Sequence, residues 1–278
     1  MQKYPLYEKA KKLLMQEYQT NYEIVKQSNY HRAYVNEKIK HSMQVSGAGN
    51  GIIANEPYFK DKSDDFIDIA RTAILLHDIY RFQEVRILFE TGQKIDHGLK
   101  GAEFLEKTKD FNDIRITLPV KHHGHMIEEM YQDESYQKLS PSLQEEVKHI
   151  AFAVRDADKI ANWYLLALSW YDMRKVWLPS PDNFSSDQAK IDTTLWDYFI
   201  NDKISPNKLR KTNGDTTVSI LCWLFDINYD YSIKYSKKLR ILEKWCHILE
   251  KLNIDSEKIE IIKQTMQKYT LKHFKTTL

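Results

Sequence analysis

The stretch ARTAILLHDIYRF, residues 70–82, decides the fold, because it places a histidine and an aspartate at the end of a strongly apolar segment. Steps of four, three and four residues mark one helix face: Phe66, Ala70, Ala73 and His77. This spacing predicts an α-helix over residues 64–80. Ser63 is a suitable N-cap, since its hydroxyl can accept a hydrogen bond from the first turn. The helix therefore carries His77 and Asp78 near its end.

Burying His77 beside Asp78 is costly unless a partner stabilises the pair. A divalent metal ion is such a partner, and imidazole nitrogen with carboxylate oxygen suits Fe, Mn, Co, Ni or Zn. A single histidine on an apolar helix face is more often a hydrogen-bonded core residue than a ligand. The metal hypothesis therefore depends on further ligands elsewhere in the chain.

Asp158 is a core-facing carboxylate on a second predicted helix. Ser140 followed by Pro141 is a start signal for this helix, which is expected to extend to about residue 171. Steps of four, three and four mark its buried face: Val147, Ala151, Val154 and Asp158. Asp156 is turned about 160° away from Asp158 around the helix. If one of the two aspartates binds a metal, the geometry favours Asp158.

The rest of the chain also predicts helices, so the expected fold class is all-α. Residues 6–24 and 97–107 have helical spacing, and Asp96 can cap the second of these segments. A total of only 8 Gly and 7 Pro disfavours a turn-rich β fold. Three glycines lie between residues 47 and 51, but no Gly-Lys-Ser/Thr follows them, which disfavours a phosphate-binding loop.

Two domains are predicted, with a boundary near residue 178. Residues 1–178 form the core domain with its N-terminal helix, and residues 179–278 form a helical extension or lid. The sequence Pro-Ser-Pro-Asp-Asn at 179–183 is typical of a linker or long loop. The extension has helical spacing but no cluster of metal ligands. It could serve as a protein-binding surface or a dimer interface, so a homo-oligomer is one expected assembly.

The charge balance and the cysteines limit the class of protein. The net charge of +2 comes from 41 basic and 39 acidic residues, which disfavours general nucleic-acid or membrane binding. The two cysteines, Cys222 and Cys246, cannot form a disulfide framework and fit a reducing cytoplasm. Residues 1–18 carry charges throughout, so no signal peptide is expected. We therefore expect a cytoplasmic protein.

The candidate ligands lie within five motifs whose order is informative. These motifs are KHSMQV at 40–45, LLHDIYRF at 75–82, DHGLKGAEFL at 96–105, HH at 122–123 and RDADKI at 155–160. Taken together, over roughly residues 34–175, they resemble the HD-domain superfamily of metal-dependent phosphohydrolases. The second motif has Tyr80 where the family commonly has glycine.

The resemblance implies an HD-domain helical bundle, with about five core helices around a metal site. The ligands that it implies for one metal are His41, His77, Asp78 and Asp158. Further histidines, His97 and either His122 or His123, imply a second divalent transition metal, with the Asp78 carboxylate bridging the two. Both His122 and His123 stay candidates at this point, and His125 is the least favoured member of the cluster.

The resemblance also implies hydrolysis of a phosphate ester by metal-activated hydroxide, with Asp78 as a catalytic residue. Arg81 lies one helical turn after the His-Asp pair and can bind a phosphate oxygen through its planar guanidinium. Lys159 and Lys100 are further candidates for binding the phosphate. For Lys100, a solvated surface charge is the favoured interpretation.

The expected substrate is a small-molecule phosphomonoester or phosphodiester, of a nucleotide or a related compound. The Gly-Tyr-Pro signature of the cyclic-di-GMP phosphodiesterases is absent after His123, which argues against that substrate. Two alternatives stay open. One is a di-iron oxygenase on the same fold, and the other is a catalytically silent nucleotide-binding module.

Overall fold

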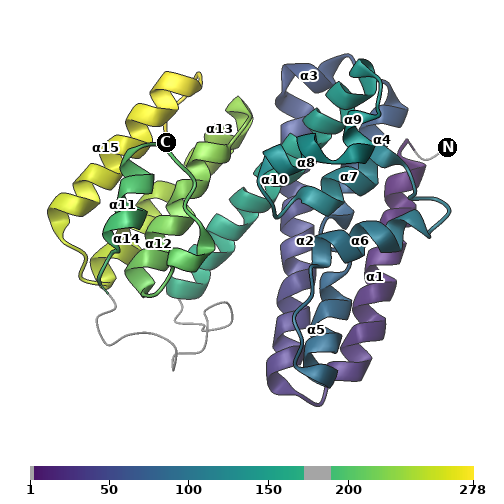
Figure 1. The fold of residues 1–278 in the computed structure, drawn as a ribbon, viewed down its shortest axis with the longest axis horizontal. Coiled ribbons are helices and arrows are strands. Elements are labelled where there is room, and N and C mark those ends of the chain that lie inside the picture. Colours follow the sequence, from purple (N-terminus) through teal and green to yellow (C-terminus); the bar gives the residue numbers. More distant parts are fainter. Residues whose placement is uncertain (1–2, 172–188) are drawn as a thin grey trace. The chain divides into compact units, whose positions relative to one another are not determined.

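The structure, a computed structural model, describes residues 3–171 and 189–278. Every regular element within these two ranges is a helix, which confirms the predicted all-α class (Figure 1). The chain divides into two compact units, Met1–Asp158 and Lys159–Leu278. The predicted linker and domain boundary at 178–183 lie outside the described residues, so that division stays a prediction.

The helices of the first unit assemble around α4. They are α1 (Pro5–Val25), α2 (Asn29–Asn55), α3 (Pro57–Lys60), α4 (Asp64–Leu76), α5 (Arg81–Thr91), α6 (His97–Glu106), α7 (Ile114–His122), α8 (Ile127–Gln132), α9 (Glu134–Gln137) and the first part of α10 (Pro141–Tyr171). Helices α1, α2 and α7 all contact α4, and α6 packs along α7. The candidate ligands come from α2, the end of α4, α6, α7 and α10.

Helix α4 begins where the sequence predicts and ends earlier. The Ser63 hydroxyl accepts a hydrogen bond from the backbone N–H of Phe66 at 3.2 Å, as expected of an N-cap. The prediction that the helix extends to residue 80 was wrong, because α4 ends at Leu76 and residues 77–80 form a turn. The helix ending therefore places His77 and Asp78 in the turn that leads into α5.

Gly49 allows α2 to lie close against α4. A Cβ atom at this position would be only 2.6 Å from Cγ2 of Ile74, a buried residue of α4. Cγ2 is attached directly to Cβ of a β-branched residue, whose χ1 angle is restricted in a helix, so this atom cannot move far to make room. Gly49, to which the sequence analysis assigned no role, thus allows α2, which carries His41, to pack closely against α4, which ends next to His77.

We expect Gly49→Ala to lower the free energy of unfolding by about 1–2 kcal/mol. Overpacking a core costs about 1–3 kcal/mol, and alanine in a helix returns about 0.5–1 kcal/mol. Gly47 on the same helix is the matched control, because a Cβ there meets nothing within 4 Å. Gly47→Ala should therefore raise stability in the same urea titration. Equal effects at the two positions would contradict the close approach.

The second unit has its own core. Its helices are the rest of α10, then α11 (Thr193–Ile200), η2 (Asn207–Leu209), α12 (Asn213–Leu221), η3 (Cys222–Asp226), α13 (Asp230–Lys238), α14 (Ile241–Lys251) and α15 (Ser256–His273). Trp163 and Trp245 are fully buried in this core. The Asp215 carboxylate accepts backbone N–H groups of Asp192, Lys211 and Thr212, which ties the start of α12 to the segment before α11.

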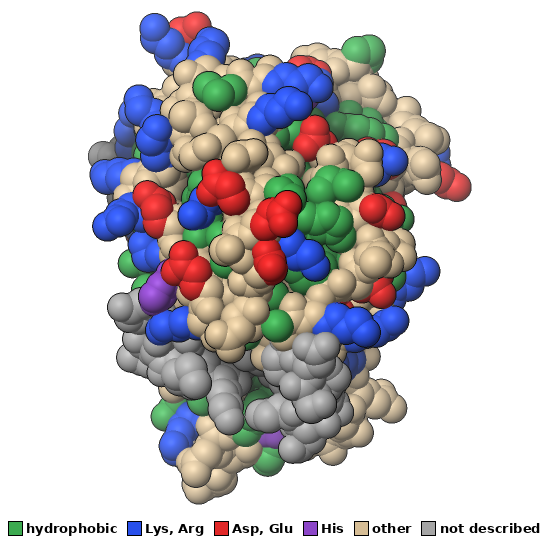
Figure 2. Space-filling view, turned by 90° about the vertical axis from the view of Figure 1, so that its left-hand side faces the viewer, with side chains coloured by type: hydrophobic (Ala, Val, Ile, Leu, Met, Phe, Trp, Pro, Cys, Tyr) green, Lys and Arg blue, Asp and Glu red, His purple; other side chains and the backbone are tan. Residues whose placement is uncertain are grey.

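Charged side chains of both signs lie on the face of the protein that Figure 2 shows. The face shown in Figure 2 has basic and acidic side chains interspersed, in keeping with 41 basic and 39 acidic residues in the chain. Among the helices of the described ranges, none is both long enough and apolar enough to cross a membrane.

Candidate metal centre

The carboxylate of Asp78 lies at the centre of the candidate site, with two histidines facing each of its oxygens. Oδ2 is 3.6 Å from Nε2 of His41 and 3.8 Å from Nε2 of His77. Oδ1 is 3.2 Å from Nε2 of His97 and 3.3 Å from Nε2 of His123. Four ring nitrogens from four different helices or helix ends therefore converge on one buried carboxylate.

Asp158 adds a second carboxylate on one side of this cluster. Its Oδ1 is 3.0 Å from Nε2 of His41 and 3.6 Å from Nε2 of His77. Asp156, two residues earlier on α10, is fully buried and is turned to another side of the helix. The structure thus brings together Asp158 and the His41–His77 pair, the arrangement that the helix spacing favoured.

Helix ends orient two of the histidines. His77 caps α4 and its Nδ1 lies 2.9 Å from the carbonyl oxygen of Ile74. His123 caps α7 in the same way, with Nδ1 2.7 Å from the carbonyl oxygen of Val120. Each carbonyl belongs to the last turn, where the helix supplies no N–H partner. Because Nδ1–H donates to this carbonyl, Nε2 is the ring atom that faces the cluster and can bind a metal.

His41 presents its ring differently. Its Nε2 is 3.3 Å from Nε2 of His77, so two ring nitrogens face each other at hydrogen-bond distance. Its Nδ1 is buried and has no hydrogen-bond partner among the described residues. The Nε2 contact can be an N–H···N hydrogen bond, whereas the buried Nδ1 is unfavourable, since a buried nitrogen normally has a partner. The short separation of the two Nε2 atoms is also one at which both lone pairs could bind the same cation.

The carboxylates of the cluster are held in the ionised form. Burial opposes ionisation of Asp78, but Arg81, His77 and Lys38 outweigh it and hold its pKa well below the ordinary value. Burial likewise opposes the charge on Asp158, and His41 and His77 hold its pKa well below the ordinary value. Ionised carboxylates are the form that binds metal.

The histidines respond to burial and to these carboxylates in different degrees. Burial lowers the pKa of His97 to about 4, although Asp78 acts in the other direction. Burial also lowers the pKa of His41. For His77, burial is outweighed by Asp78 and Asp158, and its pKa is raised. His97 and His41 are therefore held neutral, as a metal ligand must be.

The spacing of the donor atoms fits a metal ion. Ligands at about 2.0–2.2 Å from a metal lie about 3.0–3.5 Å from one another at tetrahedral or right angles. The donor atoms of His41, His77 and Asp158 are 3.0–3.6 Å apart, and those of His97, His123 and Oδ1 of Asp78 are 3.2–3.3 Å apart. His77 also belongs to a set with Asp78 and His123 in which all ligand atoms lie within 4.8 Å. The residues therefore fit one or two divalent ions.

His122 lies next to His123 in the sequence and is turned away from Asp78. Its Nε2 is 2.9 Å from Oδ2 of Asp133, which also accepts a hydrogen bond from Lys121 at 2.6 Å. Consecutive helical residues point about 100° apart, so both histidines cannot face the same carboxylate. Of the two histidines, His123 faces Asp78 and His122 faces Asp133, so the geometry favours His123 as the candidate ligand.

The three basic candidates differ in their positions. Arg81 is next to the cluster, with Nε 3.3 Å from Oδ1 of Asp78 and Nη1 2.6 Å from Oε2 of Glu84. Lys100 is solvent-exposed and pairs with Glu103 on its own helix at 2.7 Å, as a surface charge would. The Nζ of Lys159 pairs with Asp226 at 2.7 Å within the second unit. Of the three, the structure brings only Arg81 to Asp78.

Lys38 is a residue of the site that the sequence analysis did not identify. Its side chain is buried, and its Nζ lies 3.7 Å from Oδ2 of Asp78. Burial, reinforced by Arg81, lowers its pKa to about 8 against the attraction of Asp78. A signal was present, since Lys38 precedes His41 by three residues and so shares its helix face. A lone lysine at such spacing is too common to single out.

Arg155 is a second residue that sequence reasoning missed. It is buried, and its Nη1 donates to the carbonyl oxygens of His122 and His123, each at 3.2 Å, and to that of His125. It precedes Asp158 by three residues on α10. The same helix turn thus supplies a carboxylate to the cluster and holds the backbone that carries His123. Such contacts to carbonyl groups depend on tertiary packing and leave no pattern in the sequence.

Comparison with known protein families finds one match, the HD domain, over residues 39–163. The matched range begins two residues before His41 and ends five residues after Asp158, so it spans all the candidate ligands. Comparison with curated proteins and with solved structures finds no match.

Proposed function

Residues 39–163 of this chain are an HD domain, and from this premise we propose that the protein is a metal-dependent phosphohydrolase that uses two metal ions. HD domains bind divalent metals, and the superfamily is one of metal-dependent hydrolases. The observation that carries the proposal is the position of Asp78. Each of its oxygens faces its own pair of ring nitrogens, as expected of a carboxylate that bridges two ions.

The candidate ligands form two groups around Asp78. His41, His77 and Asp158 would hold one ion together with one oxygen of Asp78, and His97 and His123 would hold a second ion together with the other oxygen. When bound, divalent ions lower the pKa of a coordinated water from about 15.7 towards about 7 and offer positive charge to phosphate oxygens.

Charged side chains around Asp78 would orient the phosphate. Burial opposes the charge on Arg81, but Asp78 and Glu84 outweigh it and raise its pKa, so the guanidinium stays charged. A guanidinium has five N–H donors, more than its contacts with Asp78 and Glu84 use. Arg81 would therefore bind a non-bridging phosphate oxygen. Lys38, on the other oxygen of Asp78, would limit the negative charge of the cluster.

The net reaction is the hydrolysis of a phosphate ester. Water adds to phosphorus, the ester P–O bond breaks, and its electron pair goes to the leaving oxygen, which takes up a proton. The proposed substrates are small phosphate esters, including those of nucleotides. A screen tests this proposal by measuring phosphate released from nucleoside mono-, di- and polyphosphates and sugar phosphates. For cyclic nucleotides it measures the nucleoside monophosphate formed. Oxygen consumption without phosphate release would favour an oxygenase instead.

Arg81→Ala is expected to lower kcat/KM for any phosphate ester by about 100-fold, because it removes a donor to the charge that develops on the phosphate. Metal content should be unchanged, since Arg81 is not itself a ligand and His77 and Lys38 also keep Asp78 ionised. Arg86→Ala is the matched control on the same helix, where Arg86 pairs with Glu90 at 3.8 Å. Full activity of Arg81→Ala in a steady-state assay would rule out the phosphate-binding role.

A further inference from the structure

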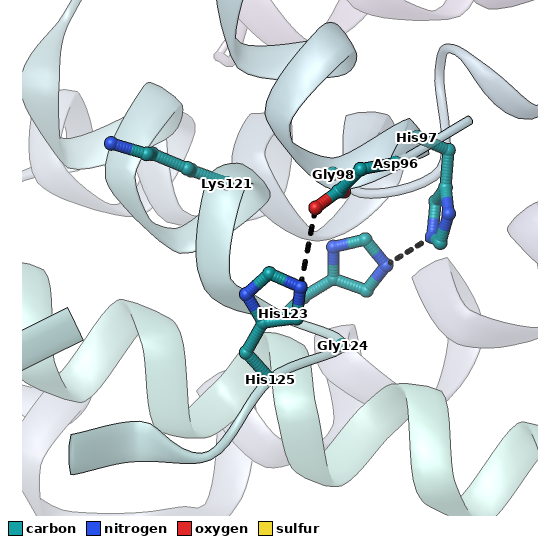
Figure 3. Close-up of a pocket in the computed structure, with 7 residues that line it drawn as sticks. All are labelled: Asp96, His97, Gly98, Lys121, His123, Gly124 and His125. Carbon is teal, nitrogen blue, oxygen red and sulfur yellow. Dashed lines mark hydrogen bonds and ion pairs between the residues drawn. The ribbon is translucent and has the colours of Figure 1, made fainter. Parts of the chain in front are cut away.

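A small cavity opens beside the candidate ligands His97 and His123. Its volume is about 230 Å³, and its walls come from residues 96–98 at the start of α6 and from Lys121 and residues 123–125 at the end of α7 (Figure 3). Two helix ends that are distant in sequence thus enclose a space directly next to one side of the Asp78 cluster.

Hydrogen-bond donors and acceptors both line this cavity. Oδ1 of Asp96 accepts the backbone N–H of Leu99, and Oδ2 lies 3.3 Å from Nε2 of His125. Figure 3 shows the ring of His125 directed at Asp96 and that of His123 directed at His97. The Lys121 side chain extends away from these groups. A carboxylate acceptor and an imidazole therefore lie side by side in the wall.

The lining determines what could be bound there. Pockets for drug-sized ligands are mostly apolar and about 300–1,000 Å³ in volume. This cavity is smaller, and its lining consists of one Asp, one Lys, two Gly and three His, so every side chain in the wall is polar. The Asp96 carboxylate opposes a second anion. Hydroxyl groups suit the wall, because each can donate to a carboxylate and accept from an imidazole.

We propose that this cavity binds the hydroxylated part of the substrate, a sugar or polyol attached to the phosphate. A volume of about 230 Å³ is enough for a compact chain or ring of five or six carbons. The proposal rests on the proposed function, since it places the phosphate at Asp78 and the carbon skeleton next to His97 and His123. Asp96 and His125 then select for hydroxyl groups.

Gly124 offers a direct steric test. A Cβ there meets nothing within 4 Å, and its φ lies outside the left-handed region, so Gly124→Leu places its side chain in open space at the cavity wall. With sorbitol 6-phosphate as substrate, kcat/KM should fall about 10- to 100-fold, as expected when a fitted group is displaced. Propyl phosphate, which lacks hydroxyl groups, should be affected much less. Gly47→Leu on α2 is the control and should leave both substrates unchanged.

Asp96→Asn tests the chemistry of the wall separately from its shape. Asparagine caps a helix about as well as aspartate, so α6 and His97 stay in place. The ratio of kcat/KM for sorbitol 6-phosphate to that for propyl phosphate should fall about 10-fold. A merely structural role of Asp96 would leave this ratio unchanged.

Binding measured by calorimetry on the metal-loaded protein makes the test independent of turnover. The wild type should bind sorbitol 6-phosphate more tightly than propyl phosphate, and Gly124→Leu should remove the difference. Equal binding of the two probes by the wild type, or a preference that survives both substitutions, would overturn the inference. If the preference is found but no phosphate is released, the proposed hydrolysis fails while the subsite stands.

Discussion

Asp78→Asn should leave the protein with almost no bound metal and lower phosphate release at least about 1,000-fold. In the proposed centre Asp78 is the only carboxylate that touches both positions, so its replacement weakens both. A thousandfold loss corresponds to about 4 kcal/mol, which is within the several kcal/mol that a bound metal contributes to such a reaction. Elemental analysis after gel filtration gives the metal content.

Asp68→Asn is the matched control, because Asp68 is a buried aspartate on α4, the helix that precedes the turn of Asp78. Asp68 accepts the backbone N–H groups of Leu6 and Tyr7 at 2.8 and 2.7 Å, so its loss weakens the attachment of α1. This variant should melt at a lower temperature and still bind metal. If Asp78→Asn folds, as judged by circular dichroism, and keeps two equivalents of metal, the bridging role of Asp78 is wrong.

Asp158→Asn is expected to remove about one equivalent of metal and to lower activity at least about 100-fold. Its carboxylate is the one that lies 3.0 Å from His41, on the side of the cluster away from His97 and His123. Loss of a charged ligand should therefore empty that position alone. The Asp158→Asn variant should therefore keep one equivalent of metal. The double variant Asp158→Asn with His97→Gln should lose that equivalent as well.

Asp156→Asn is the control for Asp158→Asn, because it tests which of the two aspartates on α10 faces the metal cluster. Asp156 is fully buried, and it lies on another side of α10, so the variant should keep its metal and most of its activity. The reverse outcome, metal lost from Asp156→Asn and kept by Asp158→Asn, would show that the assignment of the two aspartates is inverted.

Local periodicity and capping residues were sufficient to predict three of the helices that carry the ligands, α4, α6 and α10, but not α2 or α7. The spacing of Phe66, Ala70 and Ala73 defines the buried face of α4, and the Ser63 cap follows from residue type. The same periodicity misplaced the end of α4. The helix ends before His77 because the His77 ring, instead of a backbone N–H, forms a hydrogen bond with the carbonyl oxygen of Ile74. This ring orientation depends on the tertiary contacts of His77 with the Asp78 cluster.

Residues that act through tertiary contacts were harder to predict. Which of His122 and His123 faces Asp78 depends on the packing of α7 and on the contact between His122 and Asp133. The sequence shows neither. Nothing in the sequence distinguishes Lys38 from other helical lysines, and its role follows only from its distance to Asp78 in the structure. Arg155 holds carbonyl groups thirty or more residues away, and no spacing rule in the chain connects them.

The most direct test of the account is phosphate release by the wild-type protein before and after removal of its metal. Protein treated with a chelator should release no phosphate from nucleotides or sugar phosphates, and addition of Mn²⁺, Co²⁺ or Fe²⁺ should restore release in proportion to the metal bound. Phosphate release that persists in metal-free protein would contradict the account. So would protein with two bound equivalents that hydrolyses none of these esters.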